Sequence, residues 1–198
     1  KRKKMLSYEE SLKILKESKA LLDGHFILSS GLHSAQYVQC SQLLSKPYMS
    51  ANFCNSLAEK VSKELKEFDL ILSPAMGGIV IGYEMGRLLL KETIFSERVE
   101  GQFKLRRDFT ISKKSKVLIV EDVITTGKSS IECSKLVEIA DAEVIGYACL
   151  IDRSNGNSII NKKIVSQIEI NIPTYNENDL PRSLTSLPAI KPGSRELK

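Results

Sequence analysis

The sequence predicts an α/β fold in which a parallel sheet is flanked by helices. Short runs of apolar residues, typical of strands buried on both faces, alternate along the chain with longer segments of helical period. Strands that alternate with helices form βαβ units, in which the strands are parallel and the crossovers are right-handed. With 198 residues, the chain is long enough for one domain with a small appended element.

The N-terminal part is expected to contain two helices with extended segments between them. Residues 7–22 carry apolar side chains at helical spacing, with a serine as a suitable N-cap and Gly24 just past the end. Residues 25–39 are expected to form extended segments around a Ser-Ser-Gly turn. A second amphipathic helix is expected over residues 47–65, because it begins with a proline.

The remaining elements are expected to alternate between strand and helix. Buried strands are predicted at residues 69–72, 93–95, 117–120 and 143–151, helices at 79–90 and 128–140, and an edge strand at 164–172. Ligands of such sheets bind beyond the carboxyl ends of the strands. One site is therefore expected to be lined by the loops after Leu72, Phe95, Val120 and Ile151.

Composition argues against several classes of function. Hydrophobic residues make up 42% and charged residues 27%, and no apolar run reaches membrane-spanning length. The net charge of +5 is mild and the basic residues are scattered, so neither nucleic-acid nor membrane binding is expected. Residues 1–4 are expected to be a solvated tail. The four cysteines lack metal-ligand spacing and are expected to be reduced core thiols of a cytoplasmic protein. With only two histidines, a histidine-based metal centre or catalytic triad is not expected.

The most informative segment joins a buried strand to a helix. The strand ends in two adjacent carboxylates, Glu121 and Asp122, and a short loop rich in Thr, Gly and Ser then begins the helix. Backbone N–H groups at a helix start, with hydroxyl side chains beside them, form a cradle for a phosphate dianion. We call this segment the phosphate loop; its residues are Val123, Ile124, Thr125, Thr126, Gly127, Lys128 and Ser129.

The two carboxylates limit what can bind at the phosphate loop. The loop is not a Walker A motif, because Asp122 stands where that motif needs its first glycine. Adjacent carboxylates repel a bare polyphosphate, whereas the 2′ and 3′ hydroxyls of a ribose, bridged by Mg²⁺, fit beside them. The segment is therefore expected to bind a ribose 5-phosphate. The alternative is an ordinary helix cap next to two solvated acids.

Residues 117–129, with the sequence VLIVEDVITTGKS, resemble the motif with which type I phosphoribosyltransferases bind phosphoribosyl pyrophosphate (PRPP). The resemblance implies a parallel-sheet core, a flexible lid and a smaller hood that selects the base. It also implies that PRPP binds with Mg²⁺ as cofactor, carried by the substrate rather than by dedicated protein ligands. Glu121 and Asp122 are then expected to contact the ribose, and the phosphate loop the 5′-phosphate.

Further segments are similar to orotate phosphoribosyltransferases, especially to a shorter bacterial branch. They are the hood motif at residues 24–37, the pyrophosphate loop at 74–78, the lid at 95–101 and 105–107, and the segment 152–154. The resemblance covers about residues 8–156 and implies that Thr125 and Arg153 bind orotate. An arginine at a strand end can bind a carboxylate with a bidentate fork. The alternative for Arg153 is a surface ion pair with an acid such as Asp152.

The charged stretch at residues 96–115 is expected to be the lid. The resemblance implies that Arg98, Lys104 and Asp122 are catalytic, the two cations by stabilising the departing pyrophosphate. Val99 stands where many relatives have the transition-state lysine, so Lys104 is a candidate without a direct counterpart. The resemblance further implies a homodimer in which each lid reaches the neighbouring active site.

The chain is expected to be a single phosphoribosyltransferase domain that acts on orotate in pyrimidine biosynthesis. Residues 7–46 would form the N-terminal helix and part of the hood, residues 47–155 the α/β core, and residues 156–198 a C-terminal segment. One alternative is a phosphoribosyltransferase for a purine base, which needs neither the hood motif nor Arg153. Another is a PRPP-sensing regulator without catalysis, which would be expected to carry a DNA-binding domain or a basic face.

Overall fold

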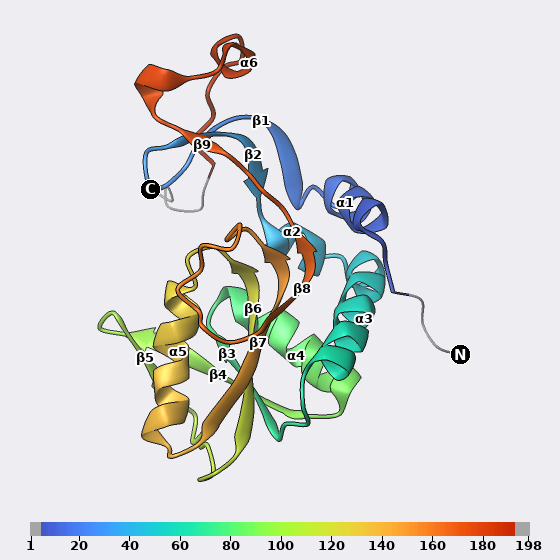
Figure 1. The fold of residues 1–198 in the computed structure, drawn as a ribbon, viewed down its shortest axis with the longest axis vertical. Coiled ribbons are helices and arrows are strands. Elements are labelled where there is room, and N and C mark those ends of the chain that lie inside the picture. The colour runs from blue at the N-terminus through green and yellow to red at the C-terminus, as the bar shows by residue number, and fades with distance from the viewer. Residues whose placement is uncertain (1–4, 193–198) are drawn as a thin grey trace.

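The computed structural model describes residues 5–192 and is built around a six-stranded sheet with the strand order β5-β4-β3-β6-β7-β8 (Figure 1). In that order the strands span Gln102–Leu105, Glu92–Val99, Leu70–Pro74, Lys116–Ile124, Glu143–Asp152 and Ile164–Glu169. All neighbouring pairs are parallel except β4 and β5, which form an antiparallel hairpin. The predicted α/β class, the parallel sheet and the edge position of β8 are confirmed.

Helices cover both faces of this sheet. The helices α1, α3 and α4 span Tyr8–Glu17, Pro47–Glu64 and Gly77–Leu89, and α5 spans Lys128–Ile139. Alternation along β6 separates two cores: Leu118 and Val120 belong to the cluster that includes α3 and α4, whereas Val117 and Ile119 belong to the cluster with α5. Figure 1 shows α5 on one side of the sheet and α3 and α4 on the other.

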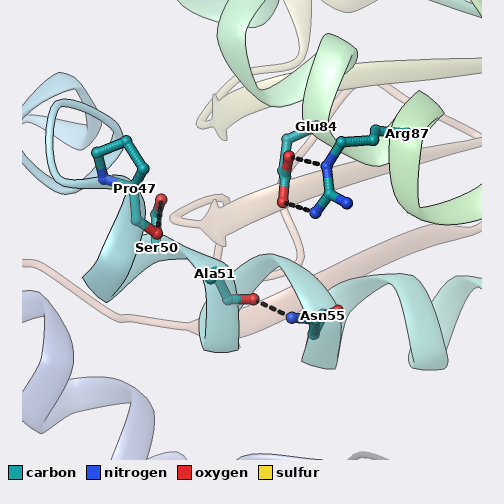
Figure 2. Close-up of polar contacts among 6 residues, drawn as sticks. All are labelled: Pro47, Ser50, Ala51, Asn55, Glu84 and Arg87. Atoms are coloured by element: carbon teal, nitrogen blue, oxygen red, sulfur yellow. Dashed lines mark hydrogen bonds and ion pairs between the residues drawn. The ribbon is translucent and has the colours of Figure 1, made fainter.

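Some polar side chains of α3 and α4 form contacts within their own helix, as Figure 2 shows. Asn55 Nδ2 donates to the Ala51 carbonyl at 2.6 Å, and Arg87 donates twice to Glu84, at 2.7 and 2.9 Å. Such bonds between residues three or four apart lie on one helix face. The two helices therefore pack on each other and on the sheet through their apolar side chains.

A second, three-stranded sheet forms the hood. Its strands β1, β2 and β9 span Leu21–Ile27, His33–Val38 and Thr174–Tyr175, and all pairs are antiparallel. Short helices accompany it: α2 at Cys40–Leu44, the 3₁₀ helix η1 at Glu177–Asp179 and α6 at Arg182–Thr185. The hood lies at one end of the large sheet, and the C-terminal segment runs back up to it (Figure 1). It is thus built from both ends of the chain.

A buried histidine pair joins the parts of the hood. Nε2 of His25 and Nδ1 of His33 are 2.6 Å apart, and Nδ1 of His25 is 3.1 Å from the carbonyl of Leu187. The carbonyl can only accept, so His25 Nδ1 carries a proton, and a neutral pair then has His33 Nδ1 donating to His25 Nε2. The two histidines have a structural role in holding the C-terminal segment against β1.

The first predicted helix ends earlier than expected. Ser7 is its N-cap in a capping box, as predicted: Glu10 N donates to the Ser7 hydroxyl and the Ser7 N–H to the Glu10 carboxylate. The helix stops at Glu17, because Lys19 takes a left-handed conformation with φ 64°. Leu21 then begins β1, so the apolar residues near position 22 that suggested a longer helix belong to a strand.

Two other expectations about strands are corrected. β6 continues through Glu121 and Asp122 to Ile124, because β7 extends beside it and pairs Val123 with Ile151. The acid pair therefore lies within a strand and not in a loop. The first part of the expected lid is likewise a hairpin, since β4 continues to Val99 and pairs with β5. We call residues 96–105 the lid hairpin.

The four cysteines are all buried and unpaired, in agreement with the expectation of core thiols. Within residues 5–192, no helix is both long enough and apolar enough to cross a membrane.

Candidate functional site

The phosphate loop borders a cavity of about 170 Å³ at the carboxyl end of β6. The cavity is lined by Glu121, by the phosphate loop and by Ser130. Gly127 is the N-cap of α5 with φ 81°, a conformation that other residues rarely adopt. The first turn of α5 thus presents its free N–H groups to the cavity, as a phosphate-binding helix start requires.

Residues 158–160, which follow β7, contact the backbone of the phosphate loop. Ile159 N donates to the Thr126 carbonyl at 2.9 Å, and Ser158 Oγ does so at 3.4 Å. A Cβ on Gly127 would lie 2.6 Å from Ser158 Oγ and 2.8 Å from Ile160. The glycine is therefore required for space as well as for conformation. Sequence reasoning missed this contact, because residues 158–160 carry no recognisable motif.

The acid pair is deeply buried for charged side chains. Glu121 is only 8% exposed, and burial, followed by the charge of Asp122, raises its pKa to about 9. Burial also raises the pKa of Asp122, although its hydrogen bonds from Val123 N, at 2.9 Å, and from Glu121 act against this. The raised pKa of Glu121 favours its protonated form near neutral pH, in which its carboxyl group donates to Asp122.

The two acids face different cavities. Glu121 lines the cavity of the phosphate loop, whereas Asp122 lines a neighbouring cavity of about 310 Å³. The other residues of this second cavity are Ser41, Leu44, Ser45, Met76, Gly77 and Val80. A Cβ on Gly77 would lie 2.8 Å from an Asp122 carboxylate oxygen. The structure thus brings the predicted pyrophosphate loop, residues 74–78, directly against Asp122.

Arg153 lies between the core and the hood. Its backbone N–H donates to the Ile124 carbonyl at 2.7 Å, which places it immediately beyond the paired ends of β6 and β7. Burial lowers the pKa of its guanidinium, while Cys40 and Tyr37 act in the opposite direction, so these two side chains face it. Its Nε is buried without a hydrogen-bond partner among the described residues.

Within residues 5–192, the surface ion pair considered between Arg153 and Asp152 is not formed. Asp152 Oδ1 instead accepts the backbone N–H of Ser154 at 2.7 Å. A buried guanidinium donor that lacks a partner is costly, since burial removes it from water. A planar anionic group such as a carboxylate could satisfy this donor.

Two of the arginines in the lid are already paired with acids. Arg98 donates to Glu132 of α5 at 2.5 Å, and Arg107 donates to Glu97 at 3.1 Å. Lys104 is exposed and makes no ion pair within the described part of the chain. The two predicted catalytic cations therefore differ in their contacts: Lys104 has no ion pair within the described residues, whereas Arg98 is bound to Glu132 of α5 in the same chain.

A comparison with protein-family models places the chain in a class. Residues 41–182 match the model described as the phosphoribosyl transferase domain. This match covers the core sheet, the acid pair, the phosphate loop and the segment that holds it, so the chain belongs to the phosphoribosyltransferase family.

Curated relatives narrow the class further. A protein of Erythrobacter litoralis named orotate phosphoribosyltransferase is 46% identical over 188 residues, 94% of this chain and 97% of its own. One of Sphingopyxis alaskensis with the same name is 49% identical over 180 residues, 90% of this chain and 92% of its own. Within its class, the chain therefore belongs to the orotate phosphoribosyltransferases.

Solved structures agree on the fold. The crystal structure of orotate phosphoribosyltransferase from Aeropyrum pernix superposes with a TM-score of 0.70 at 24% identity, over 80% of this chain and 92% of that one. An adenine phosphoribosyltransferase from Thermoanaerobacter pseudethanolicus gives a TM-score of 0.59 at 20% identity, over 68% and 88% of the two chains. Enzymes for different bases share this fold, so the choice of base must come from particular side chains.

Proposed function

We propose that the chain transfers the 5-phosphoribosyl group from PRPP to orotate, which gives orotidine 5′-monophosphate and pyrophosphate in the de novo synthesis of UMP. The choice of base is inferred from the surroundings of Arg153. Its backbone N–H donates to the carbonyl of Ile124 in the phosphate loop, Tyr37 of the hood lies near its guanidinium, and its Nε is buried without a partner among the described residues. A carboxylated base satisfies this donor and neutralises its charge, whereas adenine or hypoxanthine does neither.

The phosphate loop is proposed to bind the 5′-phosphate. The helix start supplies backbone donors, and Thr125, Thr126 and Ser129 are exposed at the cavity and can add their hydroxyls. Asp122 is proposed to accept hydrogen bonds from the ribose hydroxyls, since its carboxyl oxygens lie against the pyrophosphate loop and line a cavity. Thr125 of the phosphate loop is also proposed to contact the base.

The reaction needs no nucleophile from the protein. A ring nitrogen of orotate forms a bond to C1 of the ribose, the bond from C1 to the pyrophosphate oxygen breaks with its electron pair, and the nitrogen loses its proton. The transition state has the character of an oxocarbenium ion. Catalysis then consists of positioning the two substrates, excluding water and stabilising the charge that develops on pyrophosphate, for which Arg98 and Lys104 are proposed.

Mg²⁺ is proposed to accompany PRPP. No group of three or more His, Cys, Asp or Glu side chains in the described residues could hold a metal ion. Mg²⁺ usually binds through one or two carboxylates together with substrate phosphates. Asp122 is the carboxyl group proposed for this, since the raised pKa of Glu121 favours its protonated form. When bound, the ion would neutralise part of the pyrophosphate charge.

A homodimer in which each lid serves the neighbouring site is proposed as the working assembly. Met76, Val80 and Tyr83 are 81%, 52% and 69% exposed, and Val80 and Tyr83 lie three residues apart on α4. Figure 2 shows that Glu84 and Arg87 of the same helix pair with each other. An exposed apolar face of this kind, continuous with the cavity at Asp122, favours an isologous contact close to the active site.

The cytoplasm is proposed as the place of action, because four buried, unpaired cysteines suit a reducing compartment. The function is tested by following the loss of orotate absorbance with PRPP and Mg²⁺, and by replacing orotate with adenine or hypoxanthine. Turnover of orotate alone supports the proposal. Equal or better turnover of a purine would assign the chain to a different base. Tight binding of PRPP without any turnover would indicate a regulator.

A further inference from the structure

Arg98 is held in place by three contacts within its own chain. Its two terminal nitrogens donate to the Glu132 carboxylate at 2.5 Å and to the Gly101 carbonyl at 2.8 Å. Its guanidinium also lies over the ring of Phe103, 4.1 Å from the ring centre. Gly101 and Phe103 belong to the lid hairpin, but Glu132 belongs to α5. Of the three contacts of Arg98, the one with Glu132 reaches another element; the hairpin also meets α5 through Ser96, whose hydroxyl is 3.3 Å from the Cys133 sulfur.

Glu132 lies close to the phosphate loop. It is in the second turn of α5, four residues after Lys128, which begins the helix and lines the cavity. The positive charge of Arg98 also acts to lower the pKa of Glu121, a lining residue of the same cavity. Arg98 thus rests at the side of its own phosphate-loop cavity, between two acidic side chains.

This resting position competes with the role proposed for Arg98. The contacts with Glu132 and Gly101 use one N–H of each terminal nitrogen and fix the direction of the guanidinium, so binding pyrophosphate with a bidentate fork competes with the contact to Glu132. We propose that Glu132 is a positioning residue, which keeps the Arg98 side chain of the lid hairpin against α5 until PRPP is bound. The inference rests on the proposed function, since it takes pyrophosphate as the group for which Arg98 leaves Glu132.

The ion pair suits a reversible contact. The side chains of Arg98 and Glu132 are 42% and 28% exposed, so solvent screens their attraction. Partly exposed ion pairs contribute up to about 1 kcal/mol of free energy. Replacing Glu132 should therefore shift the equilibrium between the held and the released Arg98 by about two- to fivefold. The expected result for Glu132→Gln is a dissociation constant for PRPP lowered by that factor, because less work is needed to free Arg98.

The test is a calorimetric titration with Mg²⁺–PRPP alone, which requires no turnover of orotate. Four proteins are compared: wild type, Glu132→Gln, Arg98→Ala and the double variant. Glu138→Gln is the matched control, because it removes an exposed carboxylate from the last turns of the same helix. The proposal is supported if Glu132→Gln binds Mg²⁺–PRPP more tightly than the wild type, while the double variant binds it no more tightly than Arg98→Ala.

Other outcomes overturn it. An equal gain with and without Arg98 would show that Glu132 merely repels the phosphates. Weaker or unchanged binding in Glu132→Gln would show that the residue does not hold Arg98 back. The two proposals can fail separately. If the wild type does not turn over orotate but the binding pattern above is found, the proposed function is wrong and the role of Glu132 stands.

A second measurement follows the lid hairpin directly. The chain has no tryptophan, so Gln102→Trp, at an exposed position of β5, introduces a single fluorophore. PRPP is expected to change its emission, and the added substitution Glu132→Gln should shift the emission of the free protein towards that of the bound state. Identical spectra of the free proteins with and without Glu132, or no response to PRPP, would each refute the proposal.

Discussion

Replacing Arg153 with alanine should remove the preference for a carboxylated base. The guanidinium lies at the end of β7, its Nε is buried without a partner, and Tyr37 of the hood faces it. A hydrogen bond to a charged group contributes about 1.5–3 kcal/mol, and each 1.36 kcal/mol corresponds to a factor of ten. The kcat/KM for orotate should therefore fall by roughly tenfold to somewhat over a hundredfold.

The same change should not weaken the fold. The free protein carries the cost of a partly desolvated guanidinium, which is also why burial lowers its pKa. Removing it leaves the backbone bond from residue 153 to the Ile124 carbonyl intact. The midpoint of thermal unfolding should stay the same or rise slightly, and the dissociation constant for PRPP should change little, because the phosphate loop is a separate part of the site.

The assay is a comparison of two bases in three proteins. Orotate and uracil differ in the carboxylate, so wild type, Arg153→Ala and Arg153→Lys are measured with both. Uracil should be a poor substrate for the wild type, and its kcat/KM should fall little in Arg153→Ala. Lysine should restore orotate use only in part, since a point charge does not reproduce the planar fork. Equal losses for orotate and uracil would refute the idea that Arg153 recognises the carboxylate.

Three further predictions concern the acids and the assembly. Asp122→Asn should fold normally, since its amide oxygen can still accept from Val123 N, but should use PRPP at least about tenfold less well; wild-type turnover would exclude a role in ribose binding. Glu121 has its pKa raised from 4.5 to about 9, so between these values the folded state binds the extra proton and the free energy of unfolding falls with rising pH. Glu121 should change the free energy of unfolding by about 1.4 kcal/mol per pH unit. In urea unfolding at pH 6–8, this free energy should therefore depend less on pH in Glu121→Gln than in the wild type. The same pH dependence in both proteins would contradict the raised pKa. Mixing Arg98→Ala with Asp122→Asn should restore some activity in mixed dimers; a monomer by sizing, or no rescue despite proven subunit exchange, would rule out lids that act in trans.

The sequence alone determined the parts of the site that are local. Glu121 to Ser129 follow one another directly at the end of a strand and the start of a helix, so their register needs no distant partner. The capping box at Ser7 and the proline that begins α3 are local for the same reason. Helix caps, turns and strand alternation depend on backbone hydrogen bonds and side-chain direction among close neighbours. These features were therefore predictable.

Element ends and side-chain partners were decided by the tertiary structure. β6 continues through the acid pair only because β7 pairs beside it, and that burial is what raises the pKa of Glu121. β9 joins the hood from a distant part of the chain. Ile159 holds the phosphate loop, and Glu132 binds Arg98 although 34 positions separate the two in sequence. Such contacts form between segments that only packing brings together, so periodicity and motifs along the chain do not encode them in a readable way.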